Sequence, residues 1–347
     1  MKKIILLSAI VLTTTGKLLS QGCVAIRNVG GMSPDLLFKN VGPNDRYILN
    51  ITNRYFEASK SFRGDKSFSD TLVVNKIYTL NFSVLRLFDN GWSVGLNVPI
   101  AANSRHNGAD HKGPLSFPKY TTHAFGIGDI RLSVYKWLLN SSANAKGNVQ
   151  LGLGIKLPTG DYEYKDYFVR NDTTKVLAPV DQAIQLGDGG TGFTTELNAF
   201  YSIGRSINLY VQGFYLLNPR EQNGVSNLKG KTPTQGQINN NTTVMSVPDQ
   251  WSVRGGANFQ VSDFVFMAGL RYEKVPENDL IGGNKGFRRA ATIASVEPGI
   301  TYKMKSVLAF VYVGIPFKRN IVQNTQNDMT PAAFANWVLS AGIQFKL

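Results

Sequence analysis

The residues best suited to acid–base or metal chemistry in this 347-residue chain are its three histidines, His106, His111 and His123. A serine oriented beside a histidine can act as a hydrolytic nucleophile, and His111 with Ser104 or Ser116 is the candidate pair. The same histidines, with a neighbouring aspartate, have the donor types of a transition-metal site. No recognisable motif surrounds them, and the single cysteine excludes a zinc site built on thiolates. We predict no catalytic residue, no metal and no cofactor.

Three aspartates lie in glycine-rich motifs that suggest a second kind of chemistry. The motifs are Gly126-Ile127-Gly128-Asp129, Pro158-Thr159-Gly160-Asp161 and Leu186-Gly187-Asp188-Gly189-Gly190-Thr191-Gly192. Clustered carboxylates with backbone carbonyls suit calcium, whereas single aspartates in turns cap nearby backbone amides. We favour the turn role. The last motif is not a phosphate loop, because it lacks the lysine and the following helix.

Alternation of apolar with polar or small residues dominates the chain from Tyr47 to Leu347 and predicts β-strands. In the stretch 74–84, Tyr78, Leu80 and Phe82 share one face while asparagine, threonine and serine occupy the other. An Asn-Gly turn at residues 90–91 joins this stretch to the next as a tight hairpin. Similar stretches continue to the last residue, and we expect about twelve strands.

The connections between these strands alternate strictly between short and long. The long, polar connections are 57–73, 101–123, 158–192, 218–249, 274–290 and 317–334. A transmembrane β-barrel sorts its connections in this way, with short periplasmic turns, long extracellular loops and an even strand number. A soluble lipocalin-type barrel has only eight strands. We therefore predict an all-β fold, a transmembrane antiparallel β-barrel of about 12 strands, with aromatic residues near the strand ends at the membrane interfaces.

The N-terminal residues have the pattern of an export signal. Residues 1–22 combine two lysines, a short apolar run and a small-x-small cleavage site, which together predict a signal peptide. Cys23 would then be the first mature residue, and both a lipidated and a free cysteine are compatible with the sequence. Residues 23–46 form an N-terminal segment, either a plug in the lumen or a periplasmic tail. Residues 47–347 form the barrel, and we expect it in the outer membrane.

Charged residues of both signs fall on the polar face of the predicted strands. We expect eight of them to line the lumen: Arg54, Arg131, Lys156, Glu196, Arg254, Arg271, Glu273 and Glu297. Such groups usually pair inside a barrel, because unpaired charge in a confined lumen is costly. We place the three motif aspartates at the extracellular rim. The excess of basic residues on this polar face favours anionic solutes, for instance an aromatic carboxylate.

Positive residues in the loops suggest contact with the phosphates of lipopolysaccharide. The candidates are Arg63, Lys66, Lys112, Lys119, Arg288 and Arg289. We expect outer-membrane lipid, lipopolysaccharide and a small-molecule solute as partners, and no nucleic acid. The sequence does not indicate an oligomeric state.

The three glycine-rich motifs together resemble the outer-membrane barrel family named for the meta-pathway of phenol degradation, which is related to the long-chain fatty-acid transporter barrels. The likeness covers about residues 120–317. Gly22-Cys23-Val24-Ala25-Ile26-Arg27-Asn28 also resembles a stretch of such proteins from the Bacteroidota. The resemblance implies passage of small hydrophobic or aromatic molecules, and an N-terminal segment that enters the lumen.

We therefore predict a channel or transporter for small, hydrophobic or aromatic molecules that works by passive diffusion. A second hypothesis is a non-transporting outer-membrane scaffold that serves secretion or adhesion. A third is a lipid hydrolase embedded in a barrel, which would require the His111 pair.

Overall fold

The computed structural model describes residues 45–68, 73–107, 119–139, 146–321 and 332–347. The predicted signal peptide, Cys23 and most of segment 23–46 therefore lie outside the described residues. Thirteen strands in the described part of the chain form a single antiparallel sheet. Their bounds are β1 (Tyr47–Ala58), β4 (Val73–Leu87), β5 (Trp92–Asn107), β6 (Tyr120–Ile127), β7 (Arg131–Trp137), β8 (Gly147–Lys156), β11 (Gly192–Ile203), β12 (Ile207–Leu217), β15 (Gln250–Val261), β16 (Phe264–Val275), β17 (Ala291–Lys303), β18 (Val307–Ile321) and β20 (Val338–Lys346).

This sheet closes on itself as a barrel. β1 pairs with β20 and with β4, and β4 pairs in turn with β5, so the described strands leave no break in the ring. β6 pairs with residues 100–107 of β5, and β7 pairs with residues 92–97 on the same edge. Residues 128–130 separate β6 from β7 along the chain, so the two strands together occupy one position in the wall. The barrel therefore has 12 strands, as the alternation of the sequence predicts.

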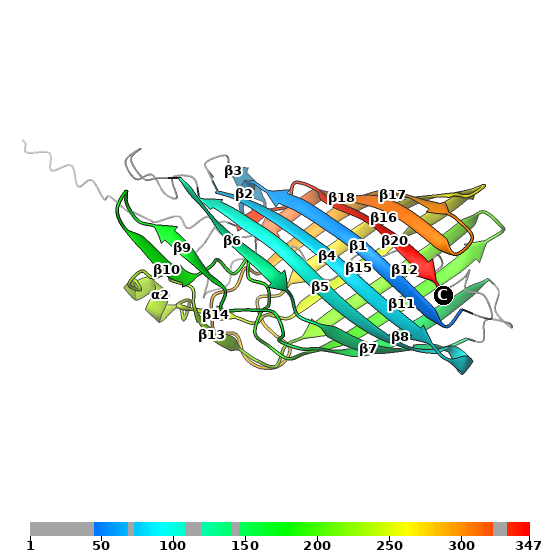
Figure 1. The fold of residues 1–347 in the computed structure, drawn as a ribbon, viewed down its shortest axis with the longest axis horizontal. Coiled ribbons are helices and arrows are strands. Elements are labelled where there is room, and N and C mark those ends of the chain that lie inside the picture. The colour runs from blue at the N-terminus through cyan, green and yellow to red at the C-terminus, as the bar shows by residue number, and fades with distance from the viewer. Residues whose placement is uncertain (1–44, 69–72, 108–118, 140–145, 322–331) are drawn as a thin grey trace, which may run out of the picture.

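Shorter elements gather at the end of the barrel where the long connections lie (Figure 1). They are β2 (Lys60–Arg63), β3 (Lys66–Phe68), β9 (Lys165–Val169), β10 (Lys175–Pro179), β13 (Gln222–Ser226), α2 (Gln235–Asn239), β14 (Val244–Ser246) and β19 (Ala332–Phe334). The C-terminus and a short 3-10 turn, η1 (Asp89–Gly91), lie at the opposite end, where the connections are short. No helix among the described residues is long and apolar enough to span a membrane.

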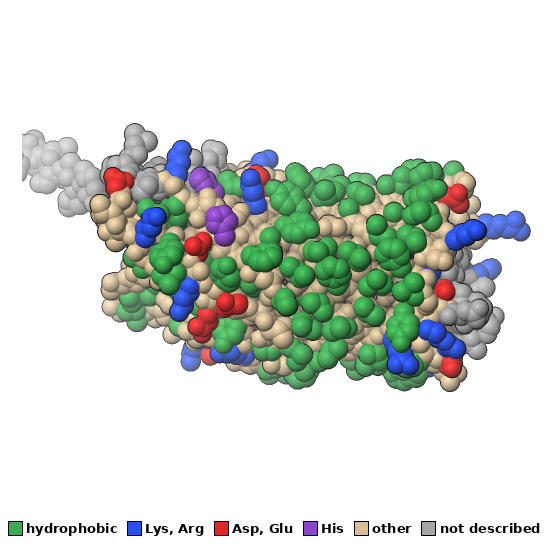
Figure 2. All heavy atoms as spheres, in the orientation of Figure 1, with side chains coloured by type: hydrophobic (Ala, Val, Ile, Leu, Met, Phe, Trp, Pro, Cys, Tyr) green, Lys and Arg blue, Asp and Glu red, His purple; other side chains and the backbone are tan. Residues whose placement is uncertain are grey.

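Side chains alternate between the two faces of the wall. In β1, Thr52, Arg54 and Phe56 are buried inside the barrel, while Tyr47 is 41% exposed on the outside. Figure 2 shows hydrophobic side chains covering the outer surface between two ends where charged side chains concentrate. Exposed apolar residues with polar ones inside are the pattern of a barrel that lipid surrounds. The protein therefore has the fold of a transmembrane β-barrel of the outer membrane.

Aromatic residues near the strand ends, expected at the membrane interfaces, lie on this outer surface. Those with large exposed fractions are Tyr47, Trp92, Tyr201, Tyr272, Tyr302 and Trp337. Several make ring contacts across neighbouring strands, for example Trp251 with Tyr272 at 5.4 Å between ring centroids. Amphipathic rings in this position suit the membrane–water interface.

The predicted loop 101–123 is partly wrong. β5 continues through Asn107 and β6 begins at Tyr120, so residues at both ends of the predicted loop belong to strands. Inward-facing Asn103 and Arg105 alternate here with small and polar outward residues. The two faces of these strands therefore do not differ in hydrophobicity, and the sequence alternation that marks a half-apolar strand is missing.

Candidate functional site

The connection between β10 and β11 enters the barrel. We call residues 180–190 the inward segment. Val180, Asp181 and Ile184 have no exposed surface, and Leu186 is only 6% exposed. Asn103 of β5 donates a hydrogen bond from its Nδ2 to the Ile184 carbonyl at 3.2 Å. The inward segment therefore lies in the lumen, where it contacts β5.

Apolar side chains hold one side of the inward segment against the wall. Val180, Ile184 and Leu186 belong to a cluster with side chains that face inward from four neighbouring strands. These wall residues are Phe56 of β1, Ile77 of β4, Ala101 of β5 and Ala124 of β6. The interior of the barrel is thus apolar on this side of the inward segment, although many other buried positions are polar.

A buried carboxylate holds the start of the inward segment. Asp181 contacts three cations: Arg289 Nη2 at 3.0 Å, Lys229 Nζ at 3.0 Å and Arg105 Nε at 3.9 Å. Burial by itself would raise the pKa of Asp181, but Arg105, Arg289 and Lys229 hold that pKa well below its ordinary value. Asp181 therefore stays ionised at neutral pH and links the inward segment to β5 and to two loops.

The three glycine-rich motifs of the sequence meet at the other end of the inward segment. Asp129 accepts one hydrogen bond from the Gly160 N–H at 3.0 Å and another from the Asp188 N–H at 3.2 Å. Thr159 donates from its Oγ1 to the Gly128 carbonyl and accepts from the Ile130 N–H, both at 2.9 Å. These hydrogen bonds thus join residues 128–130, between β6 and β7, to residues 159–160 and to the inward segment.

Two glycines allow this close approach. A Cβ on Gly160 would lie 2.8 Å from the Gly187 nitrogen and from the Leu186 carbonyl oxygen. A Cβ on Gly187 would lie 2.5 Å from Asp129 Oδ1 and 2.7 Å from the Gly160 carbonyl oxygen. Glycine is required at these positions because backbone atoms pass within contact distance of each other.

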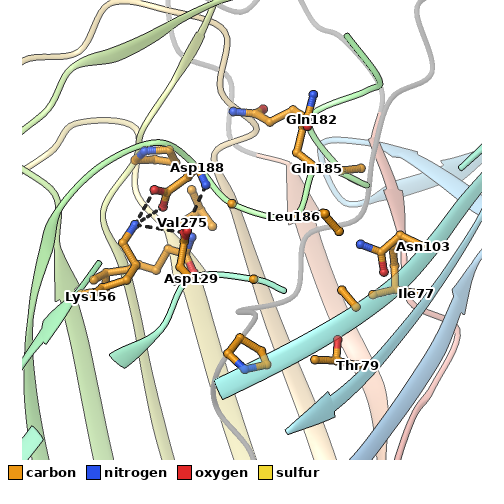
Figure 3. A pocket seen from close by; sticks show the side chains of 18 of the residues that line it. Ile77, Thr79, Asn103, Asp129, Lys156, Gln182, Gln185, Leu186, Asp188 and Val275 are labelled. Atoms are coloured by element: carbon orange, nitrogen blue, oxygen red, sulfur yellow. Dashed lines mark hydrogen bonds and ion pairs between the residues drawn. The ribbon is translucent and has the colours of Figure 1, made fainter. Parts of the chain in front are cut away.

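Lys156 lies between two of these aspartates (Figure 3). Its ammonium contacts both carboxylate oxygens of Asp188 directly, and Asp129 Oδ2 lies 3.8 Å away. The lysine is 4% exposed at the end of β8. One buried cation therefore serves two carboxylates, which would otherwise repel each other.

A cavity of about 160 Å³ lies beside the inward segment within the lumen. Apolar side chains form part of its lining, among them Phe56, Ile77, Leu186 and Phe214. Charged residues form another part: Arg54, Asp129, Arg131, Lys156, Asp188 and Arg289. Figure 3 shows the Asp129, Lys156 and Asp188 group on one side of the cavity, and Leu186 with Ile77 on the other. The cavity therefore offers an apolar surface and a charged surface to a small molecule.

Of the eight charged residues expected in the lumen, six are buried, namely Arg54, Lys156, Arg254, Arg271, Glu273 and Glu297, and Arg131 and Glu196 are partly buried. Three of them, Arg54, Arg131 and Lys156, line the cavity. The others form ion pairs: Arg254 Nε lies 2.5 Å from Glu297 Oε2, and Arg271 Nη2 lies 2.7 Å from Glu297 Oε1.

Two further contacts extend this network. Arg271 Nη1 contacts Glu273 Oε1 at 3.3 Å. Glu196 lies 4.0 Å from Arg131 Nη1 and accepts a hydrogen bond of 3.2 Å from the Tyr135 hydroxyl.

Asp161 does not join the other two motif aspartates. Its Oδ1 accepts a hydrogen bond from the Glu163 N–H at 3.0 Å on the exposed surface, which is the turn role. No group of three or more metal-binding side chains occurs among the described residues.

The histidines have separate environments. His106 Nδ1 lies 3.1 Å from Thr121 Oγ1, and the His123 backbone N–H donates to Asp166 at 2.7 Å. Asp110, His111, Lys112 and Ser116 lie outside the described residues. The candidate serine–histidine pair therefore has no structural description.

Two of the loop cations expected to contact lipopolysaccharide are wrongly assigned. Arg288 is 1% exposed and bonds Asp279 through Nη2 at 2.7 Å, while Arg289 is 9% exposed and bonds Asp181. Their loop folds back toward the barrel and pairs them with buried carboxylates. Lys66 and Lys119 are exposed and stay candidates.

Sequence reasoning did not identify the ion cluster around Asp181. Arg105 lies in a strand, Lys229 and Arg289 lie in two separate long connections, and Asp181 has no glycine-rich motif.

No protein-family model matches the chain, and no curated protein matches it. Among solved structures, the COG4313 outer membrane channel from Pseudomonas putida F1 is similar, with a TM-score of 0.60 at 11% identity over 89% of this chain and 98% of that chain. The Ralstonia pickettii toluene transporter TbuX gives a TM-score of 0.43 at 10% identity over 95% of this chain and 99% of that chain. At such identities the first likeness establishes the fold alone, which is that of an outer-membrane β-barrel.

Proposed function

We propose that this chain is a passive outer-membrane channel for small hydrophobic or aromatic molecules. The observation that carries this proposal is the cavity of about 160 Å³ inside the barrel, with phenylalanine, isoleucine and leucine in its lining. An engineered cavity of about 150 Å³ in another protein binds benzene. A site of this size and character, in the mouth of a β-barrel, fits a molecule with a single aromatic ring.

The position of the inward segment determines how a solute passes through the barrel. A solute entering from the long-loop end meets residues 180–190, which pack against inward-facing side chains of β1, β4, β5 and β6. Apolar contacts and the ion pairs of Asp181 and Asp188 hold this segment in place. Passage then requires a displacement of the segment, whereas the hydrogen-bonded wall stays closed. No energy source enters this mechanism, so transport follows the solute gradient.

Single-channel recording of the refolded protein in planar bilayers tests the proposal. We expect steady, small conductance that benzyl alcohol reduces in a dose-dependent manner, because the alcohol occupies the cavity. Protein that is folded, as judged by heat-modifiable gel mobility, but silent in the bilayer would reject the channel. That result would favour the non-transporting scaffold.

The remaining assignments belong to this proposal. We place the short turns in the periplasm and the long loops outside the cell, by analogy with other barrels. Lys66 and Lys119, both exposed at the long-loop end, are the residues we expect against lipopolysaccharide phosphates. We retain membership of the meta-pathway family, and the lumen-lining role of the eight charged residues, as parts of the same proposal.

A further inference from the structure

Three neighbouring strands of the wall change character together at the short-turn end. In the middle of the wall their outer face is apolar, and its exposed residues are Val84 of β4, Val94 and Leu96 of β5, and Leu132 and Val134 of β7. Closer to the short turns, the outward positions hold Arg86 in β4, Trp92 in β5 and Lys136 in β7. Trp92 and Lys136 are direct cross-strand partners, and β5 lies between β4 and β7. Two cations and an aromatic ring therefore end one continuous apolar surface.

Aromatic rings lie against both cations. The Arg86 guanidinium carbon is 4.9 Å from the Phe88 ring centroid and 5.9 Å from the Tyr47 ring centroid. The Lys136 ammonium nitrogen is 5.1 Å from the Trp92 ring centroid. Contacts of this kind attract a cation to the face of a ring and hold the two long side chains against the wall. We call Tyr47, Arg86, Phe88, Trp92 and Lys136 the interfacial patch.

Both cations keep hydrogen-bond donors for an anion. The Lys136 ammonium has three N–H donors and donates to the Asn90 carbonyl. Arg86 is exposed, and its donors lie in the plane of the guanidinium group. Asp89, the acid of the adjoining turn, pairs with Arg46 at 3.0 Å, and within the described ranges neither Arg86 nor Lys136 forms an ion pair. A negative group of a ligand can therefore bond to both cations.

We propose that the interfacial patch binds the headgroup of an anionic glycerophospholipid. The phosphodiester oxygens would accept charge-assisted hydrogen bonds from Arg86 and Lys136. The acyl chains would lie on the exposed valines and leucines of the same three strands. The rings of Tyr47, Phe88 and Trp92 suit the depth of the headgroups at a membrane interface.

The charge of the patch selects among membrane lipids. Phosphatidylethanolamine carries an ammonium group of its own, which the two cations repel, whereas phosphatidylglycerol has only the negative phosphodiester. Each lysine or arginine near a membrane surface adds to the attraction for anionic lipid. The choice of a glycerophospholipid over lipopolysaccharide rests on the proposed placement of the short turns in the periplasm, because glycerophospholipids form the periplasmic leaflet of the outer membrane.

Native mass spectrometry of the refolded, detergent-solubilised protein tests this inference with phosphatidylglycerol and phosphatidylethanolamine of identical acyl chains. At equal lipid concentrations we expect the protein to retain phosphatidylglycerol at least about tenfold more, since each cation contributes about fivefold. Arg86→Gln and Lys136→Gln should each lower this preference by about fivefold, and Lys136→Arg should keep it. Arg205→Gln is the matched control, because Arg205 is exposed in the short turn between β11 and β12, outside the interfacial patch.

Equal retention of the two lipids by the wild-type protein would overturn the inference, and this comparison needs no variant to fold. A preference that persists in both glutamine variants would refute the assigned site, and so would an equal loss in Arg205→Gln. Displacement of the lipid by excess glycerol 3-phosphate would show a site for soluble phosphate in place of a lipid site. None of these results bears on the proposed channel, whose conductance and sensitivity to benzyl alcohol are measured separately.

Discussion

Gly160→Ala should release the inward segment from its place in the lumen. The added Cβ would lie 2.8 Å from three backbone atoms, the Gly187 nitrogen and the carbonyl carbon and oxygen of Leu186. Backbone atoms cannot rotate away as a side chain can, so either the loop before Asp161 or the inward segment must shift. A shift also lengthens the hydrogen bond from the Gly160 N–H to Asp129, which is 3.0 Å in the native structure.

The expected size of the effect follows from these two contributions. Overpacking of this kind costs about 1–3 kcal/mol, and loss of a hydrogen bond to a charged group costs about 1.5–3 kcal/mol. Together they raise the free energy of the inward segment in its native position in the lumen, which we call seated, by about 2.5–6 kcal/mol relative to a displaced position. Since 1.4 kcal/mol is a tenfold change in an equilibrium, the ratio of seated to displaced segments should fall by at least about 60-fold.

Single-channel recording measures this change as a larger mean conductance or as a greater fraction of time in the open level. Gly213→Ala in β12 is the matched control, because its added Cβ would lie 3.6 Å from Leu197 Cβ, an ordinary contact distance. We expect the control to conduct as the wild type does. A folded Gly160→Ala protein with wild-type conductance and wild-type thermal midpoint would refute the reasoning that this junction holds the segment.

Three further substitutions test other parts of the structure. Asp181→Asn should raise conductance at neutral pH, because it leaves buried cations without their carboxylate at a cost of about 3–5 kcal/mol. In the wild type the pKa of Asp181 is depressed, so its ion pairs stabilise the folded protein fully above the ordinary pKa of about 4. This stabilisation is lost only as the pH falls through the lower pKa of the folded state. Conductance recorded from pH 8 to 5 should therefore not change through this group. Lys156→Met should lower the thermal midpoint in detergent, because Asp129 and Asp188 then repel each other, and an unchanged midpoint would contradict the shared role of the lysine. Val211→Arg, at an outward position that is 46% exposed, should cost about 2–4 kcal/mol of folding free energy in lipid vesicles, and full refolding yield would argue against a lipid-facing surface there.

The wall of the barrel was predictable because its information is local. Outward and inward residues alternate along each strand, and lipid outside with polar groups inside makes the two faces chemically different, as in β4. The same reasoning failed at residues 101–107, where Asn103 and Arg105 face inward and the outer surface is no longer apolar. The break at Asp129, which divides one strand position into β6 and β7, was likewise not apparent from the alternation.

The candidate site was predictable only in part. The glycine-rich motifs marked Asp129 and Asp188 as unusual, since glycine and aspartate together indicate a special backbone arrangement, but the motifs did not show that they meet at one junction. Arg288 and Arg289 carry no sign in the sequence that a carboxylate will bury them, and we wrongly expected them at the surface.

By itself, the sequence determined the class of fold, the number of strand positions in the barrel and, outside residues 101–107 and 120–123, which face of the strands meets lipid, because these depend on neighbours two residues apart. Only the tertiary structure decided that residues 180–190 enter the lumen, and that Asp181 gathers Arg105, Lys229 and Arg289 from three distant parts of the chain. It also decided that two acids of the cavity share Lys156 while Arg54 and Arg131 face its apolar wall. The physical reason is that ion pairs and loop packing depend on the distance between atoms across the barrel, which strand register and closure establish and which no local pattern of residues encodes.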